Sequence, residues 1–150
     1  MKTIIRRLTV SAILVVVLAA CSQQDTEFYY EGVAGKQFPD YVESSPVEHV
    51  KVAYAYAADH PEQLEYIPCY CGCGSIGHGS VKSCFLSSES DQDVSYDPHG
   101  AGCEICVQVV LDTMKGKQEG QSLQEIRQEI DRRYGERFVP TDTPEPPPDM

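Results

Sequence analysis

Basic residues are scarce in this sequence. Its 12 lysines and arginines stand against 23 aspartates and glutamates, which gives a formal net charge of −11 at pH 7. An acidic surface repels the phosphates of nucleic acids and of anionic lipid head groups. It is compatible with cationic partners, including metal ions. We therefore expect no nucleic acid among the partners of this protein.

The sequence also has no apolar run of the roughly 18 residues that a transmembrane helix needs. The run Leu8–Ala20 is shorter, follows a basic start and ends in Leu18-Ala19-Ala20-Cys21, which has the pattern of a lipobox. We expect cleavage before Cys21 and acylation of its thiol, so that membrane lipid anchors the protein on the extracytoplasmic side of the cell membrane. The alternative is an ordinary signal peptide with a chance cysteine at the cleavage site.

Motifs of the common enzymes are missing as well. The sequence shows no Ser/His/Asp order, paired carboxylates, phosphate loop or dinucleotide fingerprint, so we do not expect an enzyme. No segment keeps a period-two alternation and no repeat of 20–50 residues is visible, so little sheet and no solenoid are expected.

Helical periodicity is present instead. Ser45 and Pro46 predict a helix that begins at Pro46 and ends before Pro61, with a short helical turn over 61–67. A second helix is predicted from Gly102 to about Lys117, and its apolar face carries two cysteines at its start. A capping box at 122–125 opens a third, which Gly135 ends. The predicted fold is mostly α, a small three- to four-helix domain with an irregular Gly/Cys-rich loop.

These patterns predict that the chain has four parts. The N-terminal spacer and the Pro-rich C-terminal tail, with five prolines from residue 140 on, are expected to be disordered. The packed part is small, so metal or disulfide cross-links matter for its stability. The predicted parts are a lipoprotein signal peptide at 1–20, a lipidated N-terminus and spacer at 21–39, a Cys-rich helical domain at 40–138, and the tail at 139–150.

Six cysteines lie beyond Cys21, and three of them fall within the stretch Pro68-Cys69-Tyr70-Cys71-Gly72-Cys73. Neighbouring glycines let the backbone turn tightly, and thiolates select soft ions such as Cu(I) and Zn(II). Six sulfurs and two histidines exceed one tetrahedral site, so either two metal ions bind or some sulfurs are not ligands. The candidate metal ligands are Cys69, Cys71, Cys73, Cys84, Cys103, Cys106, His78 and His99.

Residues 66–135 resemble the bacterial lipoproteins that are named for a PCYCGC motif. The resemblance supports one domain and the lipid anchor. It implies no activity, because the family carries none that is settled. The matching segments are residues 68–73, Gly77-His78, Ser83-Cys84-Phe85, Gly102-Cys103 with Cys106, and Gly120–Arg127.

Three interpretations of the cysteines stay open. We favour soft-metal binding that buffers copper or a related heavy metal and delivers it to a metalloprotein on the outer face. A structural Zn(II), held for example by Cys71, Cys73, Cys103 and Cys106, is the simpler metal hypothesis. Three disulfides would instead make an interaction module, and fifteen pairings of six cysteines exist.

The third interpretation is thiol–disulfide exchange at Cys103 and Cys106. The two have the Cys-x-x-Cys spacing but no surrounding βαβ pattern, and Val107 stands where a c-type haem motif needs histidine. Both cysteines lie at the start of a predicted helix, whose dipole is expected to lower both thiol pKa values.

Overall fold

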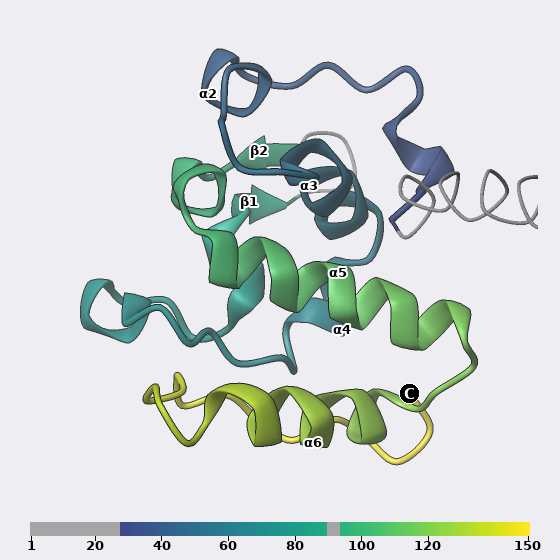
Figure 1. Cartoon of the computed structure of the whole chain (residues 1–150), viewed down its shortest axis with the longest axis vertical. Coiled ribbons are helices and arrows are strands. Elements are labelled where there is room, and N and C mark those ends of the chain that lie inside the picture. The colour runs from purple at the N-terminus through teal and green to yellow at the C-terminus, as the bar shows by residue number, and fades with distance from the viewer. Residues whose placement is uncertain (1–27, 90–93) are drawn as a thin grey trace, which may run out of the picture.

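The computed structural model describes residues 28–89 and 94–150 (Figure 1). The predicted signal peptide, Cys21 and the first residues of the spacer lie outside these ranges. Within them, every helix is too short or too polar to cross a membrane.

The fold is mostly α, as predicted. Its α-helices are α2 (Asp40–Glu43), α3 (Val50–Asp59), α4 (Pro61–Leu64), α5 (Glu104–Gln118) and α6 (Leu123–Tyr134). Short 3-10 turns are η1 (Glu31–Val33), η2 (Cys73–Ile76), η3 (Val81–Cys84) and η4 (Pro98–Gly102). Two short strands, β1 (Leu86–Glu89) and β2 (Val94–Tyr96), pair antiparallel with Leu86 opposite Tyr96.

Helix α5 lies at the centre of the molecule, between α3 and α6 (Figure 1). Its predicted apolar face is buried, and this burial supplies much of the core. The capping box at Ser122 and Glu125 is present at the start of α6, as the sequence predicted. The core residues of α5 include Cys106, Val107, Val110, Leu111 and Met114.

The first predicted helix begins four residues later than expected. Helix α3 starts at Val50, because His49 has a left-handed backbone with a φ of 57°. The Ser45 hydroxyl accepts a bond from the Val47 N–H at 3.1 Å and donates one to the Ala101 carbonyl at 2.6 Å. A contact with η4, which lies far away in sequence, therefore holds this segment out of the helix.

The C-terminal tail is extended, but its predicted disorder is wrong. The Thr141 N–H donates to the Cys69 carbonyl at 3.0 Å, and the Leu123 N–H donates to the Met150 carbonyl at 2.9 Å. Between these points the Arg127 side chain donates to the carbonyls of Thr143 and Pro144. Prolines lack N–H groups, but the carbonyls of a Pro-rich segment still accept hydrogen bonds. We call residues 139–150 the C-terminal strap.

The described part of the N-terminal spacer, residues 28–39, also packs on the domain. The Tyr30 hydroxyl and the Lys36 ammonium group both contact the Asp59 carboxylate, at 3.0 and 2.7 Å. The predicted disorder is therefore wrong for these residues too, because Asp59 and ring contacts such as that of Phe38 with Tyr96 hold them on the domain.

Candidate metal centre

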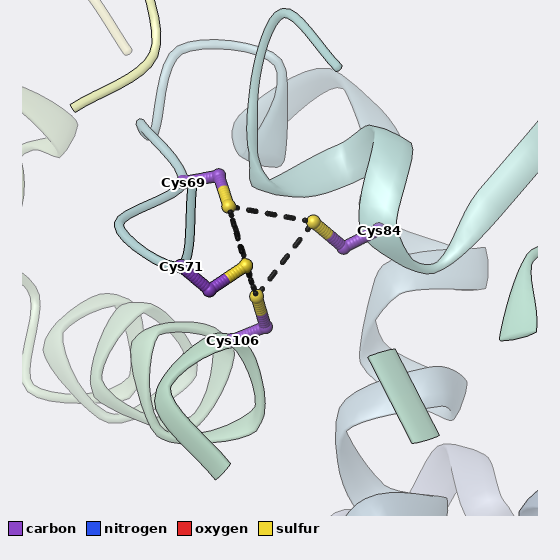
Figure 2. A group of neighbouring side chains, drawn as sticks. All are labelled: Cys69, Cys71, Cys84 and Cys106. Atoms are coloured by element: carbon purple, nitrogen blue, oxygen red, sulfur yellow. Dashed lines mark hydrogen bonds between the residues drawn. The ribbon is translucent and has the colours of Figure 1, made fainter. Parts of the chain in front are cut away.

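Four cysteine sulfurs from three separate segments meet at one point of the fold (Figure 2). Cys69 and Cys71 lie in the loop after α4, Cys84 ends η3, and Cys106 lies in the first turn of α5. All four sulfurs lie within 4.8 Å of one another, and all four thiols are free. We call these residues the four-cysteine cluster.

The loop that carries Cys69 and Cys71 is anchored by the tyrosine between them. The Tyr70 hydroxyl donates to the Asp131 carboxylate, and its ring packs on Tyr134 with 5.6 Å between centroids. Tyr70 thus binds α6, whereas its two cysteine neighbours direct their sulfurs to α5. Successive side chains that point in opposite directions are typical of an extended backbone.

The strap also holds this loop, through backbone and side-chain hydrogen bonds. The Cys69 N–H donates to the Thr141 hydroxyl at 2.9 Å, and the Cys69 carbonyl accepts from the Thr141 N–H at 3.0 Å. The Thr143 hydroxyl donates to the Gly79 carbonyl at 2.6 Å. The loop backbone is therefore fixed before any ligand binds, which lowers the entropy lost on binding.

The sulfur spacing fits a thiolate-bound metal ion. Cys69, Cys84 and Cys106 form a nearly equilateral triangle, with Sγ–Sγ distances of 3.8, 3.6 and 3.6 Å. A metal–sulfur bond of about 2.3 Å gives sulfur–sulfur distances of about 3.8 Å in a tetrahedral site. The Cys71 sulfur lies closer, 3.1 Å from Cys69 and 3.2 Å from Cys106. Thiolates this close repel one another unless protons or a cation lie between them.

The remaining two cysteines lie at the rim of the cluster. The Cys73 sulfur is 2.8 Å from that of Cys71, and the Cys103 sulfur accepts a bond from the Cys106 N–H at 3.4 Å. Both are half-buried, whereas Cys69, Cys84 and Cys106 are buried. The zinc set suggested by the sequence, with Cys73 and Cys103, is therefore not the set whose sulfurs converge.

Hydrogen bonds between the sulfurs lower the pKa of some of the six thiols and raise the pKa of others. Bonds from Cys106 lower the pKa of Cys69 and of Cys71, and they lower the pKa of Cys103 to about 6. Donating to these sulfurs raises the pKa of Cys106 itself. The predicted lowering is found at Cys103, where its largest cause is the side-chain bond from Cys106, and is wrong for Cys106. The cluster therefore pairs sulfurs of lowered pKa with sulfurs of raised pKa, and a metal ion bound to them would displace the remaining protons.

Buried aromatic side chains pack next to the segment that carries Cys84. The ring of Phe85, next to Cys84, packs edge-on against Tyr54 with 4.8 Å between centroids, and both residues are fully buried. Gly100 lies so close that a Cβ there would approach the Phe85 ring to 2.6 Å. Of the six thiols, those of Cys71, Cys73 and Cys103 are half-buried and thus accessible to solvent, whereas the other three are buried.

The two candidate histidines lie beside the four-cysteine cluster, and His78 lies within 4.8 Å of Cys73 and Cys84. The His78 Nδ1 atom is 3.4 Å from the Cys84 sulfur, and the His78 ring meets the His99 ring at 5.0 Å between centroids. His99 itself contacts Asp97, with 2.6 Å from Nδ1 to Oδ1. Sequence reasoning missed Asp97, although the Asp-Pro-His order has the form of a helix cap.

Sequence reasoning also missed the residues that support the loop from afar, chiefly Thr141 and Arg127. Neither carries a local signal, because one lies in a Pro-rich segment and the other on a helix surface of ordinary polar pattern.

Comparison with known proteins gives one match. A family model described as "Protein of unknown function with PCYCGC motif" matches residues 10–146. No curated protein and no solved structure matches the chain.

Proposed function

The chain belongs to the PCYCGC-motif family of unknown function, and we propose that it is a membrane-anchored, extracytoplasmic protein that buffers or delivers copper or a related soft metal ion. The observation that carries this proposal is the convergence of four free cysteine sulfurs, three of them buried. Clustered thiolates in a dry pocket prefer soft ions, and Cu(I) foremost. Metal binding rather than catalysis is the role that we assign to the cysteines.

Copper is favoured over a structural zinc ion by the number of sulfurs. A structural zinc site is closed by four ligands. Here two more sulfurs lie close by: the Cys73 sulfur contacts the Cys71 sulfur, and the Cys103 sulfur accepts a bond from the Cys106 N–H. A cluster with extra thiols suits an ion that is passed on, since an incoming ligand can replace one sulfur while the others still hold the ion. The metal ion is thus the cargo of the protein.

The rim of the cluster is the side for such exchange. Cys73 and Cys103 are half-buried, and the pKa of Cys103 is lowered to about 6, so that Cys103 is a thiolate at neutral pH. Thiolates of a metalloprotein on the outer face can approach here. The net charge of −11 favours a cationic partner surface.

Anchoring at Cys21 places this site outside the cytoplasm. The sequence Leu18-Ala19-Ala20-Cys21 supports acylation at the cysteine, and two acyl chains hold a protein stably at a membrane. A lipid anchor keeps the cluster near the membrane surface, where exported metal ions and membrane-bound metalloproteins are found.

Native mass spectrometry of the full chain, purified in detergent without oxygen and then given Cu(I), tests the proposal. We expect bound copper that Cys106→Ser weakens at least about 10-fold, because Cys106 contacts the other three sulfurs of the cluster. The matched control is Cys103→Ser, which keeps all four and should weaken binding far less.

Two results would contradict the proposal. Masses lower by two hydrogens for each cysteine pair, with no metal bound, would show an interaction module stapled by disulfides. One zinc ion that Cu(I) cannot displace would show a structural zinc site in place of copper delivery.

A further inference from the structure

Three side chains with nitrogen and oxygen ligands gather next to the four-cysteine cluster. His78, Asp97 and His99 place one ligand atom each within 4.8 Å of the other two. The two imidazole rings are nearly perpendicular, at 87°, and the His99 ring contacts the Asp97 carboxylate. The three come from two segments, the glycine-rich loop before η3 and the start of η4.

The core holds the backbone of Asp97 in place. The Asp97 N–H donates to the Phe85 carbonyl at 2.8 Å, and the Asp97 carbonyl accepts from the Tyr54 hydroxyl at 2.5 Å. Tyr54 and Phe85 are both fully buried. The Asp97 carboxylate also accepts from the His99 N–H at 2.9 Å. The carboxylate and the His99 backbone are therefore positioned by the fold, which separates this group from a chance meeting of surface side chains.

The ligand chemistry differs from that of the neighbouring sulfurs. Two imidazoles and a carboxylate suit borderline divalent cations such as Zn(II), Co(II), Ni(II) and Cu(II), whereas thiolates select Cu(I). About half of the His99 side chain is exposed, so water can complete the coordination. His78 is half-buried and reaches the Cys84 sulfur, so that it lies between the two ligand sets.

We propose that His78, Asp97 and His99 form a second metal site, which binds a hydrated divalent cation on the solvent side of the four-cysteine cluster. The ligands of this cation are these three side chains and water. Passage of an ion from this site to the sulfurs rests on the proposed function.

Titration with Co(II) tests the site, because its spectrum reports the ligands. Full-length protein is first loaded with Cu(I) without oxygen, so that the sulfurs are taken. We expect one Co(II) ion with weak visible bands, no sulfur-to-cobalt charge-transfer band in the near ultraviolet, and paramagnetic shifts of the His78 and His99 ring protons. His99→Ala and Asp97→Asn should each weaken Co(II) binding at least about 10-fold. The Cu(I) content should stay unchanged, which also shows that the variants fold.

The matched control is His49→Asn, which removes a histidine elsewhere and keeps a residue that tolerates the left-handed backbone at that position. The proposal would be overturned if neither His99→Ala nor Asp97→Asn lowered the Co(II) affinity, or if His49→Asn lowered it equally. So would absence of Co(II) binding. If the protein takes up no Cu(I), the proposed function fails. The same variants then judge the second site on metal-free protein through the paramagnetic shifts of the His78 and His99 ring protons.

Discussion

Two half-buried cysteines at the rim of the cluster have opposite acidities. The pKa of Cys103 is lowered to about 6, first by the bond from the Cys106 thiol. The pKa of Cys73 is raised to about 12, first by burial and then by its contact with Cys71. Both thiols are half-buried, but their pKa values are shifted in opposite directions. The pair therefore tests which sulfurs of the cluster carry protons.

We predict that iodoacetamide alkylates Cys103 at least about 10-fold faster than Cys73 at pH 7, since only thiolates react. The rate at Cys103 should fall as the pH drops through about 6. Mass spectrometry of peptides from reduced, metal-free protein measures both rates. In Cys106→Ser the hydroxyl is a different donor, and the pH at which Cys103 loses reactivity should change. An identical pH profile in that variant would show that Cys106 does not set the acidity of Cys103.

At the scale of elements, helix α6 and the C-terminal strap act together to hold the cysteine loop. Arg127 is only 7% exposed, and its guanidinium group donates to the carbonyls of Tyr66, Thr143 and Pro144. These bonds link the loop before the cysteines, the strap and α6 through one side chain. The strap in turn binds Cys69 through Thr141.

We predict that Arg127→Met lowers the free energy of unfolding by about 2–4 kcal/mol, because three carbonyls, among them the buried one of Thr143, lose their charged donor. Urea denaturation followed by circular dichroism measures this. Hydrogen exchange at the Thr141 amide should also become faster, as the strap is released. The matched control on the same helix is Arg132→Met, which is exposed and pairs with Glu129, with an expected cost of about 0.5 kcal/mol or less. Equal losses in the two variants would contradict the clamping role of Arg127.

At the scale of the whole molecule, the cluster joins segments from both halves of the chain. A metal ion held by Cys69, Cys84 and Cys106 would cross-link the loop, η3 and α5. Unfolding then requires release of the ion, so that binding adds directly to stability.

We predict that Cu(I) at about 1,000 times its Kd stabilises the protein by about 4 kcal/mol and raises Tm by at least about 10 °C. Thermal unfolding without oxygen, followed by circular dichroism, measures the shift. Protons compete for the sulfurs, so the shift should shrink as the pH falls from about 7.5 to about 5. A shift independent of pH would argue against thiolate ligands.

Elements with a strong local signal were predictable. The apolar stripe of α5 and the capping box of α6 each lie within one stretch of chain, and both are present. The start of α3 was not predictable from the sequence. Ser45 bonds to Ala101, and this distant contact overrides the local capping signal at Pro46. The packing of the strap on the domain was also not predictable. A Pro-rich composition predicts an extended backbone, but it does not indicate that Arg127 binds that backbone.

The sequence by itself determined which atoms are available: six cysteines beyond the lipobox, two nearby histidines, and three amphipathic helices to carry them. Spacing along the chain could not say which sulfurs converge, because each of the three segments reaches the cluster through packing with distant residues. Tertiary structure alone selected Cys69, Cys71, Cys84 and Cys106, left Cys73 and Cys103 at the rim, and brought Asp97 to the histidines. The physical reason is that ligand convergence depends on how α5, η3 and the loop anchored by Tyr70 and Thr141 pack together.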